Sequence, residues 1–191
     1  GPHSGWDSGS AWAALDFAPW LEVLGCTPSQ DWVVAAADGW IVYADDGLVI
    51  QDLDGDGYWQ MGWSLLYLHI EGRERVVAGA FLKAGERIGH PSCEGGASNG
   101  THVHLARRYN GEWIAADGDL PFNLDGWVSA GEGTPYNGTL TKAGKVIIAD
   151  GPGEEQETRN MPTVARTFYL PISLSYVLYF CMDQQLLRTF K

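Results

Sequence analysis

The chain has 191 residues, enough for one domain with a full hydrophobic core and rather few for two. Its composition is 45% hydrophobic and 19% charged, with 25 glycines, which suits a globular, turn-rich protein better than a disordered one. The formal net charge of −12 argues against electrostatic binding to nucleic acid or to anionic lipid.

The first 30 residues differ in pattern from the region that follows them. Residues 1–30 are rich in Gly, Ser, Pro and Trp without a sustained period, so they predict a long loop around one short apolar turn. From residue 31 onward, short β-branched or apolar runs predict an antiparallel meander, with strands at residues 32–37, 40–44, 48–51, 63–70, 81–82, 103–109 and 112–115. Hairpin-type turns are expected at Asp38-Gly39, Asp45-Asp46-Gly47 and Asn110-Gly111.

No segment before residue 165 has a convincing amphipathic helix period. We therefore expect a mainly β fold over residues 1–150, with an antiparallel β-sheet core and long loops that form a groove over the sheet. Residues 151–191 begin with a charged, linker-like sequence and continue with an apolar stretch from Phe168 to Met182. This stretch is shorter than the roughly 20 residues needed to span a bilayer, so a packed terminal strand or a tail foreign to the domain is favoured over a membrane anchor.

The histidines carry the clearest chemical pattern in the sequence. His102 and His104 lie in a strand-like run, and the period of two directs both imidazoles to one face, about 6.5 Å apart. Two such histidines alone could be surface residues, and His69, at the end of an apolar run, could by itself be a hydrogen-bonded core residue. His3 stands near acidic candidates, Asp16 among them, and two imidazoles with one carboxylate form the ligand set of a catalytic zinc site.

The segment from Cys93 to Leu105, CEGGASNGTHVHL, closely resembles the glycine-rich loop and the HxH strand of the lysostaphin-type (LytM-like) zinc metallopeptidase family. Within that family it is most similar to the β-lytic metalloendopeptidase and staphylolysin branch. Further motifs match in the right order: GPH at residues 1–3 with ALDF at residues 14–17, YLH at residues 67–69, and YNG at residues 109–111. The resemblance extends over roughly residues 1–120.

The resemblance implies a function and a role for each site residue. It implies a zinc metalloendopeptidase that hydrolyses peptide bonds in the stem peptide or cross-bridge of bacterial peptidoglycan by a metal-activated water. His3, Asp16 and His104 would bind Zn²⁺, and His69 and His102 would be the catalytic histidines that do not bind the metal. Such an enzyme is expected to be secreted or held in the cell envelope, to act as a monomer on peptidoglycan peptides, and to have no nucleic-acid partner.

Two residues compete for the role of carboxylate ligand. Many lysostaphin-type enzymes use an H-x₃-D spacing, which His3 and Asp7 match, whereas the β-lytic and staphylolysin branch has a longer insertion, consistent with the thirteen-residue step from His3 to Asp16. Residues 14–18 are an apolar run able to form a strand and to hold a carboxylate rigidly, while Asp7 lies in a flexible loop sequence. We therefore predict Asp16 as the ligand.

A disulfide between Cys26 and Cys93 is also implied, because the same branch has a disulfide that reaches the cysteine before the glycine-rich loop. The family partner lies on a strand after the first hairpin, where this chain has no cysteine. Cys26 would take its place, and Cys181 would stay a free thiol. A disulfide suits an exported protein.

Two other functions are compatible with the sequence. One is a non-catalytic peptidoglycan-binding or partner-binding module on the same fold, which would normally have lost one or more site residues. The other is a glycan-binding or calcium-dependent module, suggested by the many aromatic residues and by DLDGDG at residues 52–57, which imitates half of an EF-hand loop. The twelfth position of that loop would be Trp63 and not a bidentate Glu, which favours a hairpin tip. His90 matches no catalytic position, and Trp6 and Trp12 are expected near the groove.

Overall fold

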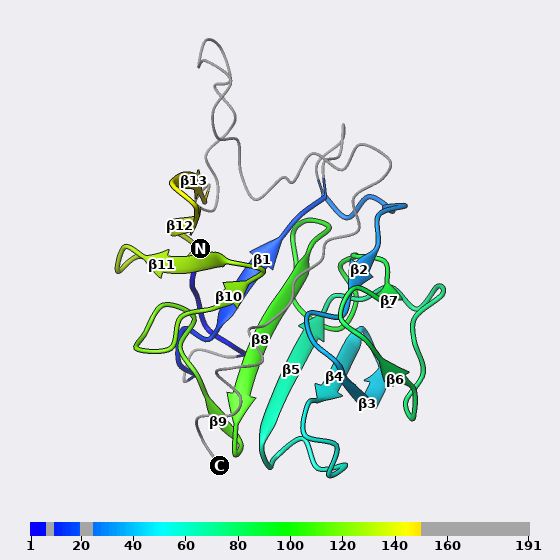
Figure 1. Ribbon diagram of the computed structural model, residues 1–191. Helices are drawn as coiled ribbons and strands as arrows, with labels where there is room; N and C mark the ends of the chain where they lie inside the picture. Colours follow the sequence, from blue (N-terminus) through cyan, green and yellow to red (C-terminus); the bar gives the residue numbers. More distant parts are fainter. Residues whose placement is uncertain (7–9, 20–24, 150–191) are drawn as a thin grey trace.

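A computed structural model describes residues 1–6, 10–19 and 25–149 of the chain (Figure 1). All regular elements in these ranges are strands, and their sheets are antiparallel, which confirms the mainly β fold class. Within the same ranges there is no helix long and apolar enough to cross a membrane. Asp7, the charged linker and the apolar stretch of the tail lie outside the described residues.

One large sheet dominates the fold (Figure 1). Its strands lie in the order β1 (Ala14–Phe17), β8 (Val103–Tyr109), β5 (Trp63–Leu68), β4 (Leu48–Asp52), β3 (Gly39–Asp45) and β6 (Phe81–Leu82), with β9 (Glu112–Trp113) paired to β8. A two-stranded sheet contains β2 (Val33–Val34) and β7 (Arg87–Gly89). A four-stranded sheet contains β10 (Asn123–Leu124), β11 (Trp127–Gly131), β12 (Gly138–Lys142) and β13 (Lys145–Ile148).

Two of the three predicted turns are confirmed as hairpins, and one is wrong. Asp46 and Gly47 have φ angles of 47° and 74° between β3 and β4, and Asn110 and Gly111 have 49° and 79° between β8 and β9. These left-handed pairs are the conformations that two-residue hairpins require. At Asp38-Gly39 no hairpin forms, because β2 pairs with β7 and not with β3.

Residues 1–30 are not one continuous loop: the apolar run at residues 14–18, described above as able to form a strand, contains β1, which pairs along its whole length with β8. Its alternating pattern explains the strand, since Leu15 and Phe17 are buried in the main core while Asp16 points to the other face of the sheet. The sequence patterns also marked no strand after residue 115, so the four-stranded sheet was missed. Its hairpin turn at Asp125 and Gly126, with φ angles of 52° and 83°, is an Asp-Gly pair of the kind that could have revealed it.

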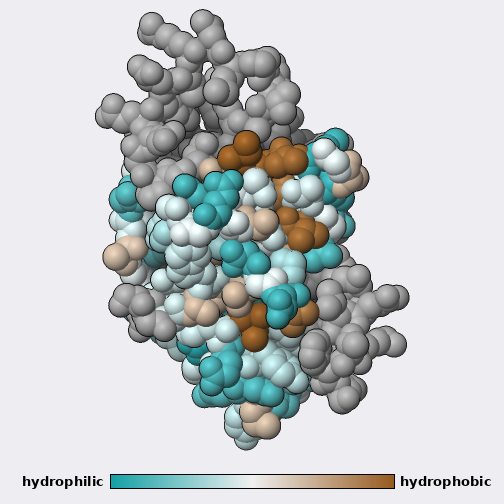
Figure 2. All heavy atoms as spheres, turned by 90° about the vertical axis from the view of Figure 1, so that its left-hand side faces the viewer, coloured by the Kyte–Doolittle hydropathy of each residue, from teal (hydrophilic) through white to brown (hydrophobic). Residues whose placement is uncertain are grey.

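The four-stranded sheet forms the side of the molecule that Figure 2 faces. Figure 2 shows apolar residues scattered among hydrophilic ones on this side, and the sheet exposes Val128, Val146 and Ile148. Scattered apolar side chains of this kind are ordinary on soluble surfaces and mark no interface by themselves.

A buried hydrogen-bond network ties β5 and β4 to the segment that follows β2. The Tyr67 hydroxyl donates to Oε1 of Gln51 at 2.9 Å and accepts the backbone N–H of Ala36 at 2.9 Å. Nε2 of Gln51 in turn donates to the carbonyl of Ala37 at 2.8 Å. Because Tyr67 and Gln51 are both fully buried, each of these polar groups depends on its partner in the network.

Replacing Tyr67 by Phe is expected to lower the free energy of unfolding by about 1–3 kcal/mol, because Ala36 N–H and Gln51 Oε1 lose a buried partner. Chemical denaturation of Tyr67→Phe beside Tyr43→Phe measures this. Tyr43 is 40% exposed, so its variant should stay within about 0.5 kcal/mol of the wild type. Equal losses in both variants would contradict the importance of the network.

Candidate metal centre

Two neighbouring strands bring an aspartate and a histidine face to face. The pairing of β1 with β8 sets Asp16 directly opposite His104. An isolated antiparallel bridge between His3 and Ala14 adds the N-terminal segment beside the same edge of the sheet. Backbone pairing therefore assembles three residues that are far apart in the sequence.

Three ligand-type atoms converge at this point. Nε2 of His3, Oδ1 of Asp16 and Nδ1 of His104 lie 3.0–3.1 Å from one another. Both imidazoles are buried, and Asp16 is partly buried. Among the described residues, this group is one of two in which three side-chain atoms lie close enough to ligate one ion.

The outer nitrogen of each ring fixes its tautomer. Nδ1 of His3 lies 3.0 Å from the carbonyl oxygen of Gly1, and Nε2 of His104 lies 2.9 Å from that of Gly5. A carbonyl can only accept, so these nitrogens must carry the hydrogen. In neutral rings the nitrogens that face Asp16 are then acceptors, and three lone pairs point at one another. One proton would satisfy one of these contacts, whereas a cation satisfies all three.

The donor set fits Zn²⁺. Zinc takes imidazole nitrogen at about 2.0–2.1 Å and carboxylate oxygen at about 2.0–2.2 Å, so ligands of a tetrahedral site lie about 3.3 Å apart. The separations of 3.0–3.1 Å found here are close to that value. The carbonyls behind both rings supply the outer hydrogen bonds that orient metal-binding imidazoles. Three protein ligands leave a fourth position for water or substrate, as in catalytic zinc sites.

The neighbours of Asp16 stabilise its charge. Burial by itself would raise the pKa of this carboxyl, but the hydrogen bonds that protonated His104 and His3 donate, and the charges of protonated His3 and His102, lower it well below its usual range. Burial likewise opposes protonation of His104, yet the hydrogen bond and charge of Asp16 raise the pKa of that imidazole. Asp16 is therefore ionised at neutral pH and provides the negative charge that a divalent cation needs.

Two further imidazoles lie next to the three converging atoms. Nε2 of His102 is 3.5 Å from Oδ2 of Asp16, and the ring centroids of His69 and His102 are 4.4 Å apart. Nδ1 of each ring lies 2.8 Å from a backbone carbonyl, that of Glu94 for His69 and that of Gly100 for His102. In its neutral form each ring therefore carries its hydrogen on Nδ1 and a lone pair on Nε2. The five residues selected from the sequence thus form one cluster: His3, Asp16, His69, His102 and His104.

The backbone of His69 has a conformation that residues other than glycine rarely adopt. Its φ is 66°, directly after the end of β5. Its carbonyl accepts from both the N–H and the hydroxyl of Ser92, at 2.7 and 3.0 Å, which holds this conformation. Burial lowers the pKa of the His69 ring despite the opposing hydrogen bond to Glu94, so the ring is neutral at neutral pH. Strained backbone of this kind is often found at functional sites.

Tyr136 is a neighbour of the site that the sequence analysis missed. Its ring stacks on that of His3 with centroids 4.2 Å apart, and its N–H donates to the carbonyl of Pro2 at 3.0 Å. Burial, and then the charge of Asp16, raise the pKa of its phenol, which keeps its proton at neutral pH. It lies in the turn-rich connection between β11 and β12, where no motif marks it in the sequence.

The remaining histidine and the two N-terminal tryptophans lie outside this cluster of five. His90 is buried, and its Nδ1 donates to the carbonyl of Asp31 at 2.7 Å, which gives this residue a structural role. Trp6 is 50% exposed and directly follows Gly5, whose carbonyl orients His104. Trp12 is partly buried, and its carbonyl accepts a backbone hydrogen bond. Their predicted place near a groove stays a prediction.

The aspartates between β4 and β5 form a hairpin tip. The buried carboxylate of Asp52 accepts the backbone N–H groups of Asp54, Gly55 and Gly57 at 2.8–3.2 Å, as an aspartate does in a turn. Burial, and then Asp52, raise the pKa of Asp54 to about 6. The flanking elements are strands and not the helices of an EF-hand. Asp52, Asp54 and Asp56 are the second group of side chains close enough to ligate one ion. The hydrogen bonds of the turn already explain why the Asp52 carboxylate is buried.

Comparison with known proteins finds a matching family and a solved structure with the same fold. Residues 24–116 match the family described as Peptidase family M23, a range that contains His69, His102 and His104 but neither His3 nor Asp16. The structure of a novel M23 metalloprotease, pseudoalterin, from the deep sea aligns with a TM-score of 0.61 at 23% identity, covering 78% of this chain and 86% of that one, which shows a shared fold. The structure of LytU aligns with a TM-score of 0.36 at 17% identity, over 59% of this chain and 85% of that one, which is too weak to establish a shared fold. No curated protein matches.

Replacing Asp16 by Asn is expected to weaken Zn²⁺ binding by more than about 100-fold. Removing a residue that only hydrogen-bonds a metal ligand typically lowers metal affinity by roughly 10- to 100-fold, and the loss of a charged ligand should lower it further. Titration with a competing chelator measures the affinity. Asp7→Asn is the matched comparison, and it should bind zinc as the wild type does. Loss of metal in the Asp7 variant alone would overturn the choice of Asp16.

Proposed function

Because this chain belongs to the M23 family of lysostaphin-type (LytM-like) metallopeptidases, we propose that it is a zinc metalloendopeptidase that hydrolyses peptide bonds in bacterial peptidoglycan. The observation that carries this proposal is the convergence of three acceptor atoms, at 3.0–3.1 Å, with both rings held in one tautomer by backbone carbonyls. His3, Asp16 and His104 are the proposed ligands. The family supports the peptidase activity, and the geometry supports the metal.

The chemistry of the reaction divides between the metal and the surrounding side chains. When bound, Zn²⁺ acts as a Lewis acid that lowers the pKa of water towards neutrality and polarises the scissile carbonyl. His104 and His3 are held for binding by the carbonyls of Gly5 and Gly1, and Tyr136 packs against the His3 ring. Asp16 stays ionised, so the three proposed ligands together carry a negative charge.

His102 is the proposed general base. Its Nδ1–H is donated to Gly100, so its Nε2 lone pair faces Asp16 at 3.5 Å, beside the proposed metal site. An imidazole in this tautomer accepts a proton from the attacking water. His69 has the same tautomer and is neutral, so it can donate to the leaving amine only after its own Nε2 has taken a proton. The tautomer thus favours the leaving amine over the oxyanion as its partner.

We also propose that the protein acts outside the cytoplasm. Cys26 and Cys93 form a disulfide, and such bonds persist in oxidising compartments and are rare where thiols are kept reduced. This agrees with a substrate in the cell wall. Peptidoglycan peptides as the partner, and a relation to the β-lytic and staphylolysin branch, rest on the sequence motifs around His69 and His102.

Treatment with a chelator is expected to abolish peptide release from purified sacculi, and added Zn²⁺ should restore it, because the proposed reaction needs the metal. Mass analysis of the released fragments measures hydrolysis and identifies the bond that is cut. Hydrolysis by protein shown to be metal-free would contradict the mechanism. Zinc-loaded protein that binds sacculi without cutting them would favour the non-catalytic binding module.

Replacing His102 or His69 by Ala is expected to leave zinc bound and to lower kcat by about 10²–10⁴-fold, the usual contribution of general acid–base catalysis. Elemental analysis and turnover of sacculi or a peptide substrate measure the two effects. His90→Asn is the control, since the amide can still donate to the Asp31 carbonyl and the residue lies outside the site; its kcat should be unchanged. Loss of metal from the His102 or His69 variants would show that their roles are assigned wrongly.

A further inference from the structure

One short loop orients both histidines that are proposed not to bind the metal. The carbonyls of Glu94 and Gly100 accept the Nδ1–H of His69 and His102, each at 2.8 Å. Both carbonyls belong to residues 93–100, the glycine-rich loop. The conformation of this loop therefore decides which ring nitrogen of each histidine faces the metal ligands.

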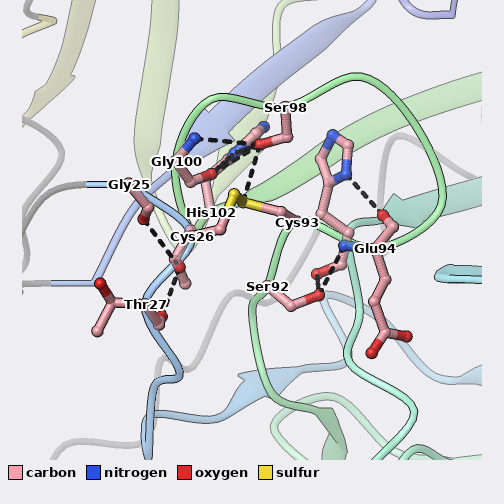
Figure 3. The surroundings of a disulfide bond; sticks show 11 residues. Gly25, Cys26, Thr27, Ser92, Cys93, Glu94, Ser98, Gly100 and His102 are labelled. Carbon is pink, nitrogen blue, oxygen red and sulfur yellow. Dashed lines mark hydrogen bonds between the residues drawn. A yellow bond between two sulfur atoms is a disulfide. The ribbon is translucent and has the colours of Figure 1, made fainter.

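A disulfide crosslinks the glycine-rich loop at its first residue. Cys93 is bonded to Cys26 across 67 residues of sequence, with Cα atoms 5.7 Å apart (Figure 3). The Ser98 hydroxyl lies 3.4 Å from Sγ of Cys93 and donates to the carbonyl of Gly100 at 2.8 Å. The disulfide, Ser98 and the carbonyl that orients His102 thus form one continuous set of contacts.

The segment that carries Cys26 also holds the other end of the loop. Thr101, directly after the loop, donates its N–H to the carbonyl of Gly25 at 3.0 Å and its hydroxyl to that of Thr27 at 2.6 Å. Residues 25–27 therefore anchor the loop covalently at its start and by hydrogen bonds at its end. Breaking the disulfide removes the covalent anchor, and with it the fixed position of the Cys93 sulfur that Ser98 contacts, while the hydrogen bonds of Thr101 remain.

The Glu94 carbonyl has a second support that does not depend on the disulfide. A Cβ on Gly95 would lie 2.4 Å from the Asp46 carbonyl oxygen, so the loop and the β3–β4 turn are in direct backbone contact. The N–H of Gly72 also donates to the Glu94 carboxylate at 2.9 Å. His69 should therefore depend on the disulfide less than His102 does.

We propose that the Cys26–Cys93 disulfide positions the catalytic histidines, His102 foremost and His69 to a lesser degree, by holding the glycine-rich loop that fixes their tautomers. The catalytic consequence rests on the proposed peptidase function. A dithiol reductant would release the loop from this crosslink: the S–S bond breaks, each cysteine sulfur gains a hydrogen, and the two thiols of the reductant become a cyclic disulfide. Reoxidation of the two thiols would restore it.

The tautomers themselves provide a test that does not require activity. Long-range ¹H–¹⁵N NMR of the zinc-loaded protein distinguishes a ring protonated on Nδ1 from one protonated on Nε2. In the oxidised wild type, His102 and His69 should both be Nδ1–H. In the Cys26→Ser/Cys93→Ser double variant, His102 should show a mixture of tautomers and His69 a smaller change. An unchanged His102 pattern would overturn the proposal even if the protein proves not to be a peptidase.

Kinetics test the consequence for catalysis. The double variant is expected to keep its zinc and to lose about 10- to 100-fold in kcat, as for the loss of an outer partner, with KM changed by less than about threefold. Reduction of the wild type should give the same loss, which reoxidation reverses, and the double variant should not respond to the reductant. Unchanged kcat in a double variant with intact folding would overturn the positioning role. Failure of oxidised wild type to cut sacculi would instead refute the proposed function.

A stability-matched variant separates positioning from general destabilisation. Ile41→Ala removes a fully buried side chain in β3, which is separated from β8 by β4 and β5. Its melting temperature should fall at least as far as that of the double cysteine variant, while its kcat well below that temperature stays within about twofold of the wild type. If Ile41→Ala loses as much kcat as the double variant, the disulfide acts through stability alone and the proposal is wrong.

Discussion

The contact of three acceptor atoms at one edge of the sheet is the constraint on which the rest of the site depends. Nε2 of His3, Oδ1 of Asp16 and Nδ1 of His104 lie at hydrogen-bonding distance with too few hydrogens among them. Folding such a group without a cation would bury lone pairs against one another, which is unfavourable in a partly desolvated site. The fold holds it through backbone pairing of β1 with β8 and through carbonyls behind both rings, so that binding of a cation relieves the repulsion.

Much of this arrangement follows from local sequence rules. The period of two in a strand predicts that His102 and His104 share a face, and the Asn110-Gly111 and Asp46-Gly47 turns predict their hairpins. Asp16 was predicted as a rigid carboxylate because apolar neighbours favour a strand there, and β1 confirms that strand. Each of these predictions concerns residues that lie close together in the chain, where conformational preference alone decides the outcome.

The features that the sequence did not reveal depend on contacts between distant segments. Nothing local tells that β2 pairs with β7 and leaves the main sheet, since the two strands are only two and three residues long. Tyr136 reaches His3 from a sheet whose own hairpins were overlooked. The left-handed backbone of His69 is unfavourable locally and is held by Ser92, 23 residues later in the chain. Tertiary contacts of this kind override propensity, and a single sequence does not display them.

The two kinds of histidine in the site are oriented by separate parts of the chain, and this separation has a functional meaning. The proposed ligands His3 and His104 take their tautomers from carbonyls in residues 1–5, whereas His69 and His102 take theirs from the glycine-rich loop. In the proposed mechanism, a change in the loop therefore turns the proton-transferring rings while the metal stays bound. Because rate depends on ring orientation and metal affinity depends on the ligand set, the fold allows the two properties to vary independently.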